Sequence, residues 1–308
     1  IFLSFMLSYA IPARRLFNRP ESGGGWMLAA TAIALAVLAP LLALAWSAAD
    51  ASLDHWAHLA RFVLPQALTN TVALLAGVGV LVTLLGTGSA WLVAAYDFPT
   101  RRVLVWALLL PLAVPTYIVA FAYLDLLHPI GPIQTAVRAL LGYDSPREFR
   151  LPDLRSLSGA IFVLGFVLYP YVYLSTRVMF MTQAASLIEA ARTLGTGRFG
   201  VFWRVALPLA RPAIVGGVAL ALMETLSDFG TVQYFGVDTF TTGIYRTWLG
   251  IGEPVAALQL AAVLLVFVFA VLLLEQWSRG EQRYHHTSRY YRRLPTYPLR
   301  GMHAAGAW

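Results

Sequence analysis

Two carboxylates interrupt an otherwise apolar stretch of this chain. Glu224 and Asp228 lie four residues apart in the run from Pro212 to about Phe235, a spacing that puts two side chains on one face of a helix. Each would cost about 2.5 to 3.5 kcal/mol facing lipid, so both should face a bundle interior or water. They either line a passage and favour a cation there, or hydrogen-bond neighbouring helices and cap a broken span.

Several kinds of chemistry are excluded by missing residue types. All 22 basic residues are arginine and there is no cysteine. A P-loop needs a lysine to reach the terminal phosphates of ATP, so this chain cannot itself be a Walker-type ATPase. His55 and His58 form an H-x-x-H pair without a third ligand, so we expect no metal site and no cofactor. Every histidine falls in a predicted loop or tail, which argues against an intramembrane hydrolase.

A second chemically distinctive segment, EAARTLGTGRFGVFWRVALP, runs from Glu189 to Pro208. Ser186 and Glu189 form a capping box that would start a short helix, and Gly195 would end it. Such a helix, joined to the apolar runs on both sides, lets a partner that grips it move both runs together. The alternative is an amphipathic helix lying among lipid headgroups. The surface available to a partner comprises Leu187, Ile188, Ala190, Ala191 and Leu194.

The elements that position these residues must be membrane helices. Of the 308 residues, 59% are hydrophobic and only 12% charged, too few polar residues to cover a water-soluble surface of this size. A span needs about 20 apolar residues. The runs that meet or approach this length are Trp26 to Trp46, Thr71 to Tyr96, Val103 to Leu124, Leu157 to Thr176 with a kink expected at Pro170, Pro212 to about Phe235, and Pro254 to Leu274.

Three segments between these runs are long enough to fold. The first, residues 125–156, is rich in proline, and a short surface helix is expected from Ile133 to Leu141. The second, residues 177–211, contains the Glu189 to Pro208 stretch. The third, from about Thr231 to Glu253, is rich in glycine and threonine and is expected to be an outer loop.

Arginine placement predicts the orientation of the chain. If six spans alternate from an inside N-terminus, most arginines fall on the inner side, as the positive-inside rule requires. Both termini are therefore expected in the cytoplasm. The arginines expected outside are Arg61, Arg138, Arg147, Arg150, Arg155 and Arg246.

The spacing of the inner segment resembles the signature of ABC importer permeases. That signature is EAA, three residues, glycine, nine residues, an aliphatic residue, any residue and Leu-Pro. The matching positions here are Glu189, Ala190, Ala191, Gly195, Val205, Leu207 and Pro208, with valine where isoleucine is commoner. The resemblance implies an ATPase-coupling role for these residues and Ser186, and a bacterial inner-membrane location.

Within that family, the stretch ETLSDFGTVQYFGVDTFTTGIYRTW, Glu224 to Trp248, is similar to ferric iron permeases. Thiamine, sulfate and polyamine permeases share the inner loop but look less alike. The iron family implies two six-helix halves on one polypeptide. The tail RRLPTYPLRGMHAAGAW resembles a linker into a second half, so we expect an N-terminal half.

The expected fold is an all-α membrane protein, a type I permease domain of six helices with a cytoplasmic coupling helix. Residues 1–25 are an N-terminal segment, 26–277 the permease domain with its coupling loop at 183–211, and 278–308 a tail or linker. Expected partners are an ABC ATPase dimer, a second permease half, a solute-binding protein and the bilayer, with no nucleic acid. A secondary transporter is the alternative, but it predicts an inverted repeat and leaves the EAA segment unexplained.

Overall fold

The structure is a computed structural model that describes residues 23–50, 53–182, 191, 193–279, 297–298 and 306. The chain divides into two compact units, Ile1–Ala51 and Ser52–Trp308. In the first unit, helix α3 (Gly23–Asp50) contains an apolar stretch long enough to span a bilayer, Gly25–Ser47.

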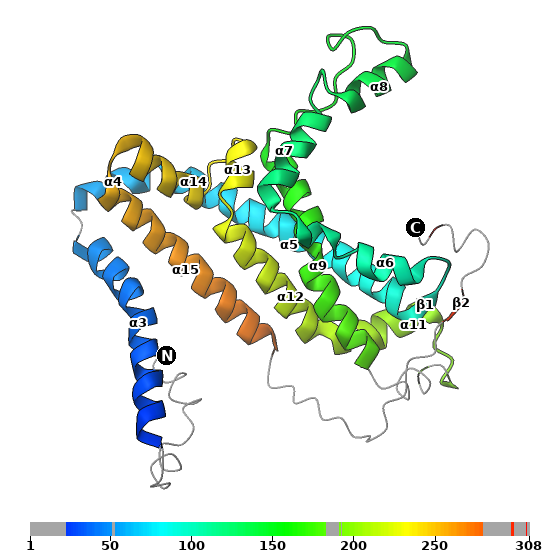
Figure 1. Ribbon diagram of the computed structural model, residues 1–308, viewed down its shortest axis with the longest axis horizontal. Coiled ribbons are helices and arrows are strands. Elements are labelled where there is room, and N and C mark those ends of the chain that lie inside the picture. The colour runs from blue at the N-terminus through cyan, green and yellow to red at the C-terminus, as the bar shows by residue number, and fades with distance from the viewer. Residues whose placement is uncertain are drawn as a thin grey trace. The chain divides into compact units, whose positions relative to one another are not determined.

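Helices dominate the described part of the second unit (Figure 1). Among the described residues, five helices, α3 included, are long and apolar enough to cross a membrane. The number is six if one bent pair of helices counts as a single span. This confirms the expected all-α membrane fold.

The elements of the second unit are α4 (Leu53–Phe62), α5 (Leu64–Ala95), β1 (Tyr96–Asp97), α6 (Arg101–Ala107), η1 (Leu110–Ala113), α7 (Thr116–Leu126), α8 (Pro132–Leu141), α9 (Leu157–Thr182), α11 (Arg198–Val201), η2 (Phe202–Ala206), α12 (Leu207–Ser227), α13 (Gly230–Tyr234), α14 (Phe240–Tyr245), η3 (Arg246–Ile251), α15 (Pro254–Arg279) and β2 (Tyr297–Pro298).

The core of this unit is formed where α5 packs along α9, with α12 beside both (Figure 1). Small residues allow the close approach. A Cβ atom added to Gly86 of α5 would lie 2.6 Å from Cβ of Val172 and 2.9 Å from the carbonyl oxygen of Tyr169, both on α9. Pro170 lies inside α9, which continues through it.

The expected helix from Val103 to Leu124 is not continuous, and that prediction is wrong in this respect. The chain instead forms α6, the short 3-10 helix η1 and α7, and the two parts, Arg101–Ala113 and Thr116–Leu126, are bent by 96°. Pro111 and Pro115 cause the break, since proline has no N–H to give to the preceding turn and its ring clashes with that turn.

The expected run from Pro212 to Phe235 is also divided. Helix α12 begins earlier, at Leu207, and ends at Ser227, and α13 follows as a separate short helix. Asp228 terminates α12 with an extended backbone, φ −67° and ψ 126°. Glu224 and Asp228 therefore do not share one face of a continuous helix.

The segment expected as a glycine- and threonine-rich loop is largely helical. It folds into α13, α14 and the π-helix η3 before α15 begins. Thr239 and Thr242 form a reciprocal capping box at the start of α14, with the backbone N–H of Thr239 donating to Thr242 Oγ1 at 2.8 Å. Threonine side chains at these positions satisfy helix-end donors, which explains how the sequence supports short helices there.

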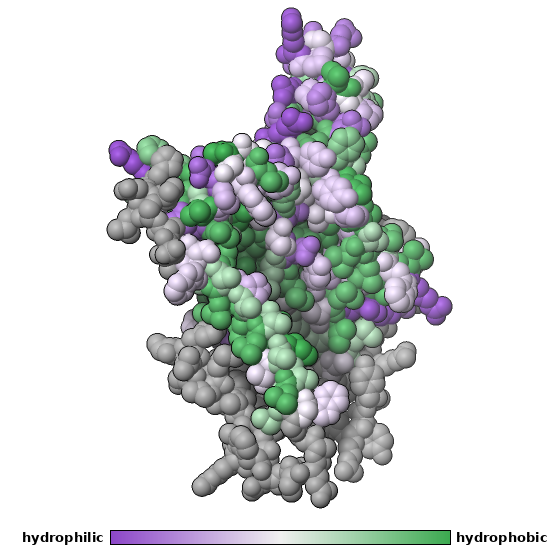
Figure 2. All heavy atoms as spheres, turned by 60° about the vertical axis from the view of Figure 1, so that its left-hand side comes forward, coloured by the Kyte–Doolittle hydropathy of each residue, from purple (hydrophilic) through white to green (hydrophobic). Residues whose placement is uncertain are grey.

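Helix α8 agrees with the short surface helix expected near Ile133 to Leu141, and its segment projects beyond α7, away from the bundle (Figure 1). Gln134 is only 1% exposed and joins the two ends of this segment through hydrogen bonds to the backbone. Its side-chain amide donates to the carbonyl of Leu127 at 2.6 Å, and its oxygen accepts from the N–H of Leu151 at 3.1 Å. Figure 2 shows hydrophilic side chains gathered on this projecting segment, while hydrophobic ones prevail over the helices below it.

The described strands form one parallel pair. Tyr96 pairs with Tyr297 and Asp97 with Pro298, which brings a piece of the C-terminal tail to the turn between α5 and α6.

Candidate functional site

The predicted coupling segment is described only in part. Ala191, Gly195, Val205, Leu207 and Pro208 are described, whereas Ser186, Glu189 and Ala190 lie outside the described residues. Gly195 adopts φ +83°, a left-handed conformation that glycine enters without strain. The N–H of Thr196 donates to the carbonyl of Ala191 at 3.0 Å, the six-to-one bond of a Schellman helix end. Gly195 therefore ends a helical turn, as its position in the sequence predicts.

The C-terminal part of the motif leads directly into α12. Val205 lies in the π-helix η2, and Leu207 and Pro208 form the first residues of α12. The N–H of Leu207 donates to the carbonyl of Phe202, five residues back. Proline at 208 has no N–H to continue the ordinary ladder, so the helix is wider at this point. From Arg198 onward, the coupling segment and the span thus form one continuous helical path.

An aromatic cluster ties this junction to the core. The ring of Phe202 lies 5.2 Å from that of Trp91 on α5, and Trp91 lies 5.2 Å from Phe180 on α9. Aromatic pairs at such distances contribute more than their buried area alone. The cluster therefore connects the junction to α5 and α9 as well as to α12.

Other apolar side chains of the same segment are exposed. Leu194 is 85% and Phe199 76% exposed, and the exposed ring of Trp203 lies 5.9 Å from the ring of Phe199. We name Leu194, Phe199 and Trp203 the coupling patch. Exposed apolar groups of this kind are suited to contact with lipid or with a partner protein, and Phe199 and Trp203 fall within the candidate span Phe199–Ser227.

Glu224 and Asp228 have different surroundings. Glu224 lies in the last turn of α12 with its side chain exposed. In a chain that crosses lipid, an exposed carboxylate at a helix surface is tolerated where that surface faces water or another protein.

Asp228 is half-buried, and each of its carboxylate oxygens accepts two hydrogen bonds from neutral donors. Its Oδ2 accepts from the hydroxyls of Thr116 at 2.7 Å and Thr231 at 3.0 Å. Its Oδ1 accepts from the backbone N–H groups of Thr231 at 2.9 Å and Val232 at 3.2 Å. The carbonyl of Asp228 accepts from the hydroxyl of Thr241 at 2.8 Å. This geometry matches the alternative in which the carboxylate bonds a neighbouring helix and caps a break.

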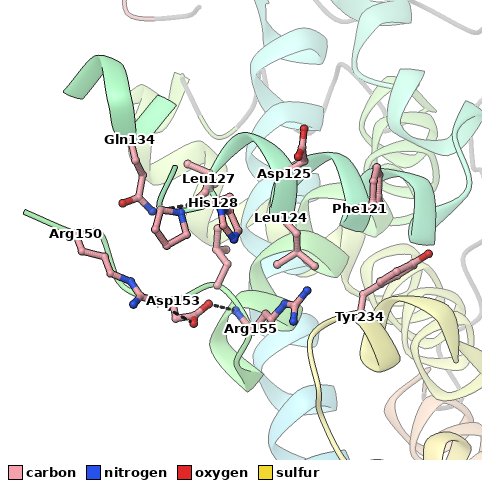
Figure 3. A pocket seen from close by; sticks show the side chains of 12 residues that line it. Phe121, Leu124, Asp125, Leu127, His128, Gln134, Arg150, Asp153, Arg155 and Tyr234 are labelled. Carbon is pink, nitrogen blue, oxygen red and sulfur yellow. Dashed lines mark hydrogen bonds and ion pairs between the residues drawn. The ribbon is translucent and has the colours of Figure 1, made fainter. Parts of the chain in front are cut away.

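A pocket of about 340 Å³ lies between α7, the base of the α8 segment and α13. Figure 3 shows Phe121, Leu124 and Tyr234 on one side of it and Arg150 and Asp153 on the other. Arg150 is paired with Asp153 at 3.1 Å. With two arginines and two aspartates the lining carries no net charge, so it does not favour ions of either sign. The lining residues are Phe121, Leu124, Asp125, Leu127, His128, Pro129, Gln134, Arg150, Asp153, Leu154, Arg155 and Tyr234.

No group of three or more histidines, aspartates or glutamates within the described residues is placed to hold a metal ion. The side chains of His55 and His58 lie outside that description.

Sequence reasoning did not find the partners of Asp228 or the aromatic cluster at the junction. Thr116 lies 112 residues before Asp228, and nothing in the local sequence links the two. The available signal was Pro115, because backbone groups freed by a proline break need partners from neighbouring helices or from Ser and Thr side chains.

Solved structures define the class of protein to which this fold belongs. A crystal structure of a bacterial ABC transporter involved in the import of the acidic polysaccharide alginate matches with a TM-score of 0.63 and 20% identity, over 83% of this chain and 96% of that one. The architecture is that of a type I ABC transporter permease.

The sequence comparisons give the family. A model of the binding-protein-dependent transport system inner membrane component matches residues 83–278, and the chain belongs to that family of multi-pass inner-membrane proteins. It is 26% identical to the Fe(3+)-transport system permease protein FbpB 2 of Haemophilus influenzae, over 73% of this chain and 40% of that protein. It is 27% identical to the molybdenum transport system permease protein ModB of Escherichia coli, over 61% of this chain and 81% of that protein. The chain therefore spans less than half the length of its iron-transporting relative.

Proposed function

We propose that this chain is a permease half of an ATP-driven importer that takes up ferric iron. The observation that carries the coupling role is the junction at Phe202, where one aromatic side chain joins the coupling segment to α5 and α9 through Trp91 and Phe180. The ATP hydrolysis itself belongs to a separate ATPase dimer, because this chain has no lysine for a P-loop.

The ATPase docks on the segment where the sequence predicts a helix from near Ser186, which includes Glu189, Ala190 and Ala191, and on the coupling patch. When ATP closes the ATPase dimer, the coupling segments of two permease halves are drawn together. Because each segment continues into α12 through Val205, the spans rock from inward-open to outward-open. Hydrolysis returns them to the starting state.

The organisation of the transporter follows from this role. Residues 26–277 form one permease domain, both termini lie in the cytoplasm, and residues 278–308 lead towards a second half. A solute-binding protein delivers cargo on the outer face. The match covers 40% of the length of the iron relative, which leaves room in that relative for a second half.

Ferric iron is favoured by three observations. The stretch from Glu224 to Trp248 resembles ferric iron permeases, and an iron permease is among the relatives. The exposed carboxylate of Glu224 on α12 also fits a passage for a cation, since a fixed negative charge attracts cations and repels oxyanions. Molybdenum is the second candidate, because the molybdenum permease has a similar identity. Thiamine, sulfate and polyamine remain alternatives.

The docking proposal is tested by Leu194→Arg in the assembled transporter. Leu194 is 85% exposed, so the substitution should leave the fold intact while placing a charge where an apolar contact forms. We expect that the ATPase no longer co-purifies with the Leu194→Arg permease. Leu140→Arg is the matched control, because Leu140 is 87% exposed on α8, and it should retain the ATPase. Equal retention by both variants would contradict docking at the coupling patch.

A further inference from the structure

Two breaks in two different spans lie side by side. Helix α7 starts at Thr116, directly after the 96° bend that divides the third apolar run. Helix α12 ends at Ser227, and Asp228 follows. The hydroxyl of Thr116 donates to Oδ2 of Asp228 at 2.7 Å, so a single hydrogen bond joins the two breaks.

The Asp228 carboxylate joins these elements without a counter-charge. Its four donors are neutral, from Thr116 at the start of α7 and from Thr231 and Val232 in α13. No salt bridge to Asp228 occurs among the described residues, whose ion pairs involve other aspartates. Hydrogen bonds to an ionised acceptor are about twice as strong as neutral ones. The carboxylate is therefore well suited to holding α7 and α13 together.

Packing along the two helices agrees with this link. A Cβ atom added to Gly230 of α13 would lie 2.7 Å from Cβ of Tyr117, so the helices are in close contact next to Asp228. Further along, the rings of Phe121 and Tyr234 lie 6.1 Å apart. Figure 1 also draws α7 and α13 as neighbours. The contact between them thus extends from the joint towards the pocket above it.

We infer that Asp228 is a positioning residue that locks α7 to α13, so that the two helices move as one outer gate about the paired breaks at Pro115 and Asp228. The gating role rests on the proposed transport function, whereas the lock is a property of the fold. The residue acts through Thr116 and Thr231 and does not bind the cargo.

The chain has no cysteine, so introduced pairs report on the lock directly. Phe121→Cys with Tyr234→Cys connects α7 to α13. Tyr123→Cys with Phe162→Cys connects α7 to α9, and these rings are also 6.1 Å apart. Each pair is treated in membranes with a short bis-maleimide, and the rate of cross-linking is measured without ATP or cargo.

Thr116→Val removes the hydroxyl but keeps the size of the side chain. We expect it to slow cross-linking of the Phe121/Tyr234 pair by about tenfold, because a hydrogen bond to a charged acceptor contributes about one to two tenfold factors. Thr116→Ser should restore the rate. The Tyr123/Phe162 pair serves as the folding control and should cross-link normally in Thr116→Val. An undiminished rate for the Phe121/Tyr234 pair would refute the lock.

The gate is tested in the assembled transporter after cross-linking. Transport should continue when α7 is joined to α13 and should stop when α7 is joined to α9, since only the second link ties the moving pair to the bundle. The reverse result would overturn the gate. Loss of transport only after the Phe121/Tyr234 cross-link would also overturn the gate. A transporter that takes up no cargo even before cross-linking, while the rates without ATP still depend on Thr116, would refute the proposed function and leave the lock intact.

Discussion

At the scale of the residue, two acidic side chains four positions apart have different surroundings. Asp228 is surrounded by neutral hydroxyl and backbone donors, whereas Glu224 is exposed on α12. Several hydrogen-bond donors around a carboxylate hold it in one geometry. An exposed carboxylate instead attracts or repels nearby ions through its charge. The pathway proposal therefore depends on Glu224.

Replacing Glu224 with Gln keeps the shape of the side chain and removes its charge. We expect cation uptake to fall by about tenfold or more, because one unit charge at close range contributes on the order of 1 to 4 kcal/mol at dielectric constants between those of water and a protein surface. Uptake by proteoliposomes and co-purification of the ATPase should be measured together. Normal uptake, or loss of the ATPase, would contradict a charge-based role in the passage.

At the scale of the element, close helix packing is set by individual glycines. Gly77, Gly86, Gly165 and Gly217 leave no space for an added Cβ atom, whereas Gly88, two residues from Gly86, faces open space. The sequence alone presents Gly86 and Gly88 as equivalent. Only the facing backbone of α9 distinguishes them.

This difference predicts opposite effects on stability. Gly86→Ala should destabilise the protein by about 1 to 3 kcal/mol, the usual cost of overpacking a filled site. Gly88→Ala should be neutral or stabilising by up to about 1 kcal/mol, since alanine favours a helix over glycine. Thermal unfolding of the detergent-solubilised protein compares the two variants. A lower melting temperature for Gly88→Ala than for Gly86→Ala would contradict the packing of α5 on α9.

At the scale of the whole molecule, the substrate that the assembled transporter takes up distinguishes the iron proposal from the molybdenum alternative. The transporter, assembled with its ATPase and binding protein, should accumulate radiolabelled ferric iron, and excess molybdate should not compete. The physical reason is the fixed negative charge of Glu224, which disfavours an oxyanion. Molybdate uptake that excess ferric iron leaves unchanged would favour the molybdenum alternative.

Much of the fold could be predicted because a bilayer imposes local requirements. Each span must be an apolar run of about 20 residues that satisfies its own backbone hydrogen bonds, and such runs can be found without knowing their neighbours. The helix end at Gly195 is equally local. The prediction of a continuous helix from Val103 to Leu124 failed because apolar composition does not reveal how far Pro111 and Pro115 bend the chain.

The sequence by itself determined that this protein belongs in a lipid bilayer, that it is helical and how its coupling motif is spaced. Each of these properties depends on residues close together in the chain. Only the tertiary structure decided that Asp228 bonds Thr116, that Phe202 meets Trp91 and that Gly86 is enclosed by α9. These contacts join residues far apart in the chain. Their geometry depends on how all the helices pack at once, so no local pattern encodes it.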